Sequence, residues 1–492
     1  MCFNKTNFLL LFLLPVFVSC SGLQSYYSKI ETFMTKEKYE SAQALTFDSK
    51  KVYGTKNELL YYLDLGLLEH LSKNYEKSNV AFEQAKQIYS KNYTKSISAG
   101  AVSLFSNDNV IPYYGNAYEM AYTNIFCALN YILQNQNNEA VVEARQVDNL
   151  FKKINADTYG KDFYKDDPFI RYFMGIVYEN AGYYNDALIS YKLALKNYAS
   201  YNSTNKNYEK GNNNIYDLKA PSDLLYSLYD LTLKLGMKQE AEQLRQQYNI
   251  ALKQKYENCG ELIIINYNGL SPKKIDNIIE MSVYNAWPYF NSSQAKNEDL
   301  AKVEQVNSAI RAGLSDAYIK IAFPKYVRFN NEIDSFCLEE IDFQNKKTTK
   351  IENSDSTEVS DIGTLLIKDL ERKNAAVYSK TIARALGRYV LARVAVNQVR
   401  QQESNKDHTL SILANSILNI ANSVLEKADK RSWRTLPETI NMVRLYIPEG
   451  THKLNINFLN SSNNVVLTQQ ITADIIKNRK TFVIVNSFKS NK

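Results

Sequence analysis

The sequence has few of the residues that most often perform catalysis or bind metal ions. Its 492 residues include three histidines, His70, His408 and His452, which lie in three separate segments. The motifs HExxH, GxSxG and GxGxxG and the Walker phosphate-binding loop do not occur. We therefore expect no enzyme activity, no metal site and no cofactor. A hydrolase whose carboxylates meet only through folding is left open as an alternative.

Cysteine is scarce as well. Besides Cys2 and Cys20 near the N-terminus, the chain has Cys127, Cys259 and Cys337, with no CxxC or other spacing typical of a metal site. We interpret these three as buried small side chains. The sequence leaves open whether Cys259 and Cys337 form a disulfide.

Neither sign of charge dominates the composition. Lysine and arginine total 59 and aspartate and glutamate total 52, so the formal net charge is +7. So small an excess indicates no dedicated nucleic-acid groove, and no nucleic-acid partner is expected. The length is sufficient for two or three domains, each with a hydrophobic core.

An apolar run of eleven residues, Phe8 to Val18, follows Lys5 near the N-terminus. It is too short to cross a hydrocarbon core of about 30 Å as a helix and is typical of a signal peptide. The end of the run and the two residues after it, Phe17-Val18-Ser19-Cys20, resemble the lipobox cut by lipoprotein signal peptidase. The resemblance implies a diacylglyceryl thioether on Cys20 and an acylated amino group, which together anchor a protein stably. An ordinary cleaved signal peptide is the alternative.

This N-terminus predicts a lipid-anchored protein of the cell envelope. The residue after the cysteine is Ser21 and not the aspartate associated with retention at the inner membrane. We therefore expect the outer membrane, with the protein facing either the periplasm or the surface.

A helical hairpin is predicted from Pro168 to Ala199. The tetratricopeptide (TPR) pattern has a small residue, an aromatic residue three positions later, then Ala, and then an aromatic residue four positions after the Ala. These positions hold Gly175, Tyr178, Ala187 and Tyr191. Because two helices nest closely where small residues face aromatic rings, we expect two antiparallel helices that turn at Gly182.

Weaker copies of this hairpin occupy residues 57–90, 124–151 and 224–250. Gly66, Ala128 and Tyr229 take the position of Gly175 in them, at intervals of 62, 47 and 54 residues along the chain. These intervals all exceed 34 residues and predict irregular repeats with inserted loops. Four copies are enough to bury a shared core, although unrelated amphipathic helices are the alternative. The residues expected to pack within the hairpins are Gly66, Phe82, Ala128, Ala140, Gly175, Tyr178, Ala187 and Tyr191.

The second half of the chain shows β-type patterns. Short apolar or alternating runs predict strands at residues 261–265, 318–323, 335–343, 443–447, 453–458, 465–472 and 481–485. The last four are expected to form a compact antiparallel sheet. Helical periodicity predicts helices at residues 299–312, 381–399 and 410–425.

The predicted fold class is α+β multidomain, with an N-terminal α-helical TPR-like repeat array and a C-terminal α+β domain that contains antiparallel strands and a helical hairpin. The expected boundaries are a signal peptide at 1–19, an anchor linker and capping helix at 20–56, repeats at 57–256, a β-rich segment at 257–345, a linker at 346–361, a helical hairpin at 362–430 and a β segment at 431–492.

The stretch Ser432-Trp433-Arg434-Thr435-Leu436-Pro437 is distinctive. With residues 138–145, 260–262, 268–272 and 443–450, it resembles a largely uncharacterised family of TPR-containing bacterial lipoproteins. The resemblance implies an outer-membrane or periplasmic lipoprotein. Some members of the family lie beside other envelope-assembly lipoproteins. The resemblance assigns no reaction to particular residues. Trp433 either forms a recognition patch with Arg431 and Arg434 or fills the junction of a helix and a sheet, and we favour the second interpretation.

We expect a scaffold or adaptor that binds an envelope protein or peptide, in envelope or outer-membrane assembly. The resemblance to TPR domains places the contacts on the first helix of each repeat. The candidate residues are Tyr122, Leu129, Tyr172, Glu179 and Asn180. A glycan- or peptidoglycan-binding lipoprotein is the alternative, which the presence of only two tryptophans weakens.

Overall fold

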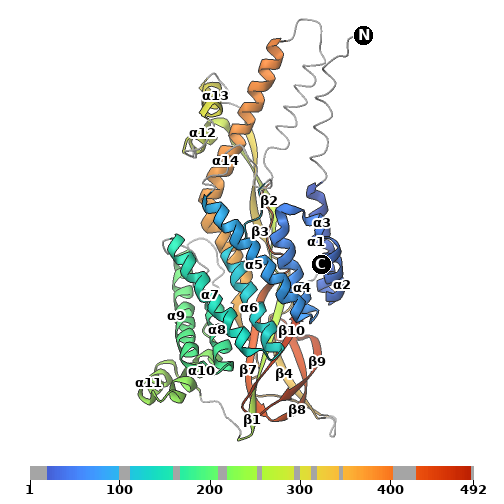
Figure 1. Cartoon of the computed structure of the whole chain (residues 1–492), viewed down its shortest axis with the longest axis vertical. Coiled ribbons are helices and arrows are strands. Elements are labelled where there is room, and N and C mark those ends of the chain that lie inside the picture. The colour runs from blue at the N-terminus through green and yellow to red at the C-terminus, as the bar shows by residue number, and fades with distance from the viewer. Residues whose placement is uncertain are drawn as a thin grey trace.

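The computed structural model describes residues 19–98, 111–158, 167–208, 219–251, 257–292, 300–311, 318–342, 347–402 and 428–488. They form a layer of helical hairpins, two β-sheets beside it, and an arm that extends away from both (Figure 1). Within these ranges, no helix is long and apolar enough to cross a membrane.

The first helices cover one end of the helical layer. They are α1 (Ser19–Thr35), α2 (Tyr39–Asp48), α3 (Lys50–Tyr53) and the short 3-10 helix η3 (Thr55–Asn57). On α1, the buried face contains Tyr26, Tyr27, Ile30 and Met34. The hydroxyl of Tyr27 donates to Asp64 of α4 (Glu58–Leu71) at 2.8 Å, so α1 belongs to the folded body.

In the part of the chain that the structure describes, four helical hairpins form the layer. They are α4 (Glu58–Leu71) with α5 (Tyr75–Ser98), α6 (Ala117–Leu133) with α7 (Asn137–Thr158), α8 (Pro168–Asn180) with α9 (Tyr184–Tyr208), and α10 (Ser222–Lys234) with α11 (Lys238–Tyr248). Each hairpin turns at a residue with a positive φ angle, between 60° and 82°, two positions after its first helix. These residues are Lys73, Asn135, Gly182 and Gly236.

Close helix packing explains two of the glycines. A Cβ atom on Gly66 would lie 2.5 Å from the ring of Phe82, and one on Gly175 would lie 2.4 Å from the ring of Tyr191. No side chain fits in either space, because these distances are far below van der Waals contact. The other residues expected to pack within the hairpins are also buried, namely Ala128, Ala140, Tyr178 and Ala187.

Two sheets, each with four strands among the described residues, pack face to face. The first has the order β10 (Lys480–Ser487), β1 (Cys259–Leu270), β7 (Pro437–Pro448) and β6 (Thr357–Asp361). The second has the order β5 (Lys347–Lys350), β4 (Ser335–Asp342), β8 (Gly450–Leu459) and β9 (Val465–Ile475). Apolar side chains from both sheets, such as Leu262, Val443, Phe336 and Ile456, share one core. The two sheets therefore form a β-sandwich.

The C-terminal strands differ from the predicted compact antiparallel sheet. β7 and β8 are consecutive, yet they belong to different sheets, and β10 pairs with β1 in parallel. Pro448, at the end of β7, has no N–H with which to continue a hairpin ladder. Hydrophobic periodicity shows where a strand lies but carries no information on its direction.

The segment 346–361, predicted as a linker, contains β5 and β6. Its polar residues bind the second sheet, because the hydroxyls of Ser354 and Ser356 accept hydrogen bonds from the backbone of β4 at 3.1 and 2.8 Å. The polar composition that suggested a loop therefore reflects side chains bound to a neighbouring strand.

The arm has its own small core. It consists of the two-stranded ribbon of β2 (Lys273–Ser282) and β3 (Tyr318–Val327), with α12 (Val283–Ser292), α13 (Leu300–Arg311) and part of α14 (Ile362–Gln402). Side chains of all three helices and of β3 form this core, including Phe290, Val306, Ile321 and Leu386. The second helix of the predicted hairpin, at residues 410–425, lies outside the described residues.

Candidate functional site

The helical hairpins and the sandwich share one continuous core. Every residue of β1 is buried, since one face of the strand packs on the second sheet and the other packs on the helices. Ile263, Ile265 and Tyr267 belong to the same apolar cluster as Phe126 of α6 and Tyr172 of α8. The surface of the hairpins that was expected to hold a peptide is therefore covered by the chain's own β-sheet.

Three of the five candidate partner-binding residues are buried by this contact. Leu129 of α6 lies in the shared core. The hydroxyl of Tyr122 donates to Asp167 at 2.8 Å and lies 2.6 Å from the hydroxyl of Ser360 in β6. Tyr172 lies beside Arg444 of β7, with 3.4 Å between its hydroxyl and the nearer guanidinium nitrogen. These three side chains are not part of an exposed groove.

The other two candidates are partly buried and have partners within the chain. Asn180 donates to Asn137 at 2.9 Å. Glu179 accepts hydrogen bonds from Lys480 at 3.0 Å and from Arg444 at 3.3 Å. The lipidation candidate Cys20 lies in the first turn of α1.

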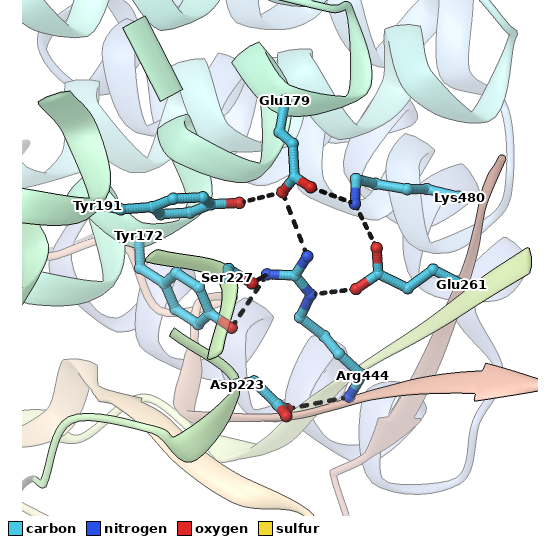
Figure 2. A network of polar contacts seen from close by, with 8 residues as sticks. All are labelled: Tyr172, Glu179, Tyr191, Asp223, Ser227, Glu261, Arg444 and Lys480. Atoms are coloured by element: carbon cyan, nitrogen blue, oxygen red, sulfur yellow. Dashed lines mark hydrogen bonds and ion pairs between the residues drawn. The ribbon is translucent and has the colours of Figure 1, made fainter. Parts of the chain in front are cut away.

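Arg444 is the centre of a polar network at this junction (Figure 2). It is 1% exposed, and its guanidinium donates to Glu261 at 2.7 Å, to Ser227 at 2.8 Å and to Glu179. Lys480 of β10 bridges the same two carboxylates. Asp223 of α10 also accepts a hydrogen bond from the backbone N–H of Arg444 at 3.1 Å, so the network joins α8, α10, β1, β7 and β10 with two cations and three carboxylates.

The electrostatics of this network make it a structural clamp. Burial alone would raise the pKa of Glu261, but the charges of Arg444 and Lys480 outweigh burial and lower it, and they lower the pKa of Glu179 in the same way. Both carboxylates are thus held ionised, with their oxygens occupied by hydrogen bonds. Such groups are poor proton donors and poor bases at neutral pH.

Trp433 fills the junction between the helices and the first sheet. It is 1% exposed, its ring centroid lies 6.0 Å from those of both Phe82 and Phe126, and its Nε1 donates to Thr435 at 2.9 Å. The neighbouring arginines are paired, Arg431 with Asp429 at 2.8 Å and Arg434 with Glu31. The interpretation of Trp433 as a packing residue is confirmed.

Two buried polar side chains of α4 complete the junction. Asp64 accepts hydrogen bonds from Tyr27, Tyr53 and Thr435, each at 2.8 Å, and burial raises its pKa to about 6. His70 lies 3.0 Å from the hydroxyl of Tyr267, and burial lowers its pKa to about 4, so it is neutral at pH 7. The sequence carried a signal for both, since a charged residue within an apolar helix requires buried partners.

The described residues contain no cluster of three or more His, Cys, Asp or Glu side chains placed to hold a metal ion. The thiols of Cys127, Cys259 and Cys337 are free and buried. His452 pairs with Glu340 at 2.8 Å on the surface of the second sheet. The hydrogen bonds and packing at this junction support a structural role for its polar side chains.

No family model and no curated protein matches the chain. Among solved structures, it is similar to a putative kinesin light chain with TPR-like repeats from Podosopora anserina, at 14% identity over 46% of this chain and 93% of that one, with a TM-score of 0.30. It is also similar to BtubC (BKLC) from P. vanneervenii, at 12% identity over 48% and 84% of the two chains, with a TM-score of 0.30. A third similar structure is MamA AMB-1, at 14% identity over 46% of this chain and 90% of that one, with a TM-score of 0.27. Likenesses at this level carry no functional information.

Proposed function

We propose that this protein is a lipid-anchored scaffold of the cell envelope, tethered through Cys20, that binds a protein partner on its arm. The groove of the repeats is occupied by the chain's own sheet, so the partner requires another surface. The arm supports this role because apolar side chains are concentrated on its exterior. Of the seventeen large apolar side chains exposed in the described residues, seven lie on β2, β3 and α12. They are Ile275, Ile278, Ile279, Tyr284, Tyr289, Tyr318 and Val327.

The edge of β2 favours a partner that binds as an extended strand. Among the described strands, β2 pairs with β3 alone, which leaves one side of its backbone without a neighbouring strand. Unpaired strand edges with exposed apolar side chains are templates for an added strand. Ile278 is 64% exposed and Ile275 is 38% exposed along this strand. A partner segment on β2 would gain main-chain hydrogen bonds and cover these side chains.

The experiment that tests the proposal compares two isoleucines of similar exposure. Ile278 on the arm is 64% exposed and Ile189 on α9 is 58% exposed. In a cross-linked pull-down of the tagged lipoprotein from its native envelope, Ile278→Asp is expected to lose the partner that the wild type retains. Ile189→Asp is expected to retain it. Loss of the partner from both variants, or from neither, would contradict the assignment to the arm.

The anchor is tested in the same cells. Cys20→Ser removes the thiol that the lipid requires, and the protein is expected to move from the membrane fraction to the soluble fraction. A variant that stays in the membrane fraction would show that the attachment does not depend on Cys20.

A further inference from the structure

Two large apolar side chains are exposed on the first helices of the described chain. Phe47 of α2 is 62% exposed and Val52 of α3 is 41% exposed. Single exposed apolar side chains are common on protein surfaces, so the surroundings of these two decide whether they have a role. Both lie on the short helices that follow α1, the helix that contains Cys20.

Tyr26 of α1 connects these two helices to the start of α1. Its hydroxyl donates to Thr46 of α2 at 2.6 Å, and its ring centroid lies 5.3 Å from that of Tyr53 of α3. The exposed residues of α2 and α3 are the immediate neighbours of Thr46 and Tyr53 in the chain. In Figure 1, α1, α2 and α3 lie together at one edge of the molecule. The two exposed side chains and the start of α1 therefore belong to the same corner of the protein.

The chain between Cys20 and this corner is short. Tyr26 is 5% exposed and follows Cys20 by six residues. Six residues cover about 9 Å as a helix and at most about 22 Å when they are fully extended. A lipid on Cys20 would thus hold Tyr26, and the helices that contact it, within this distance of the membrane surface.

Lysine and tyrosine lie beside the exposed apolar side chains. The Nζ of Lys50 donates to the hydroxyl of Tyr62 at 2.9 Å and lies 4.9 Å from the centre of its ring. Both residue types combine an apolar stem or ring with a polar end, which suits the boundary between lipid and water. Because charges of both signs are present here, a lipid contact depends on the apolar side chains and not on an excess of charge. The charged residues of the stretch 47–58 are Asp48, Lys50, Lys51, Lys56 and Glu58.

We propose that Phe47 and Val52 insert into the surface of the phospholipid bilayer to which Cys20 is attached. The proposal rests on the lipid anchor proposed above and adds a second contact with the same membrane. The anchor keeps this corner close to lipid, so insertion requires no separate encounter from solution. Insertion also removes the apolar surface of both side chains from water. Two contacts hold the body in one orientation, whereas the lipid alone allows it to rotate.

The test measures whether position 47 lies within the bilayer. The purified lipoprotein is reconstituted into phosphatidylcholine vesicles with or without bromine on the acyl chains, because this bromine quenches indoles that lie in the bilayer. Phe47→Trp is expected to add fluorescence, relative to the wild type, that the brominated lipid quenches. Ile189→Trp is the matched control, since Ile189 is 58% exposed on α9, at the opposite edge of the molecule (Figure 1). Its added fluorescence is expected to be the same in both kinds of vesicle.

Equal quenching of the two variants, or quenching of neither, would overturn the proposal. Fluorescence of Phe47→Trp that is shielded from aqueous iodide but not quenched by brominated lipid would also overturn it. In that case a protein surface, and not lipid, would cover this residue.

Flotation of the same vesicles distinguishes failure of the anchor from failure of the insertion. If the wild type does not float with the vesicles, the anchor at Cys20 is contradicted and the insertion with it. If the wild type floats and Phe47→Trp is not quenched, the anchor stands and the insertion alone is contradicted.

The melting temperature of Phe47→Asp in detergent distinguishes a membrane contact from a structural side chain. Because Phe47 is exposed, this variant is expected to melt at the temperature of the wild type. A clear fall would show that Phe47 stabilises the fold, and it would contradict the proposal.

Discussion

Arg444 illustrates how single buried charges hold the two halves of the protein together. Its partners Glu179, Ser227 and Glu261 come from three different elements, and Lys480 closes the network from a fourth. A buried carboxylate is stable only while its cations are in place. The network therefore stabilises one relative position of the helices and the sandwich.

Arg444→Met is expected to lower the free energy of unfolding by about 3–5 kcal/mol, because it leaves Glu261 and Glu179 with one cation between them. Denaturant titration measures the change. Arg245→Met is the control, since Arg245 forms an exposed ion pair with Glu242 on α11. The denaturant concentration at which half of this variant is unfolded is expected to stay close to that of the wild type. Equal effects of the two substitutions would argue against a clamp at Arg444.

Glu358 of β6 predicts a dependence of stability on pH. Burial and the charge of Asp361 raise its pKa to about 8 from an ordinary value of 4.5. Between these two pH values the folded protein keeps a proton on Glu358 that the unfolded chain releases. The stabilisation that this proton gives is complete below pH 4.5 and is lost as the pH rises through 8. Glu358→Gln, which stays neutral, is expected to melt at a higher temperature than the wild type at pH 8.

The difference between this variant and the wild type is expected to shrink at pH 5. Glu304→Gln, at an exposed position of α13, is the control and is expected to change the melting temperature equally at both pH values. A Glu358→Gln variant whose advantage is the same at pH 5 and pH 8 would be inconsistent with a raised pKa.

For single residues, the sequence predicted the roles that depend on contacts with residues nearby in the chain. The predicted start of a hairpin at Pro168 coincides with the start of α8, where Asp167 accepts a hydrogen bond from the backbone N–H of Phe169 at 2.9 Å and caps the helix. The pair of Arg444 and Glu261 could not be predicted, because 183 residues separate them and they meet only through the fold. Trp433 was interpreted correctly because a large aromatic side chain gains most free energy when it is buried in a core.

Among the elements, the helical hairpins show the strongest link between sequence and packing. Gly66 and Phe82, like Gly175 and Tyr191, are 16 residues apart and in contact. The second hairpin has Ala128 and Ala144 at the same spacing, and both are fully buried. Where the first helix has a glycine, the residue 16 positions later is aromatic. Where the first helix has an alanine, that residue is another alanine.

Gly175→Ala is expected to destabilise the protein by about 1–3 kcal/mol, because the new methyl group collides with the ring of Tyr191. Helix propensity alone predicts the opposite sign, since alanine favours a helix by about 1 kcal/mol over glycine. Thermal or denaturant unfolding of the variant decides whether the steric clash or the helix propensity is the larger effect. A more stable variant would show that the two helices do not approach as closely as described.

The strands were predicted less completely than the hairpins. Apolar runs located β1, β3 and β4, because strands of this kind alternate or are buried on both faces. The strands β5 and β6 were missed, since their residues are polar and bind neighbouring strands. The parallel pairing of β10 with β1 could not be predicted, as it depends on how the chain crosses between the two sheets.

On the scale of the whole molecule, the repeats and the sandwich form one body. The helices cover the outer face of the first sheet (Figure 1), and the network of Arg444 lies at their contact (Figure 2). Trp433 packs in the core that the helices share with this sheet. The sequence showed that a helical surface exists but not that the same chain occupies it. This is why three of the five expected partner contacts are buried and why the proposed partner surface is on the arm.

Native-state hydrogen exchange of β1 tests this central claim most directly. If the sheet is a permanent part of the helical layer, the amides of Glu261 to Asn268 will exchange only by global unfolding, with the same opening free energy as the amides of α8. Exchange of β1 through a lower-energy opening that leaves α8 protected would contradict the account, because the groove of the repeats could then be vacated for a partner.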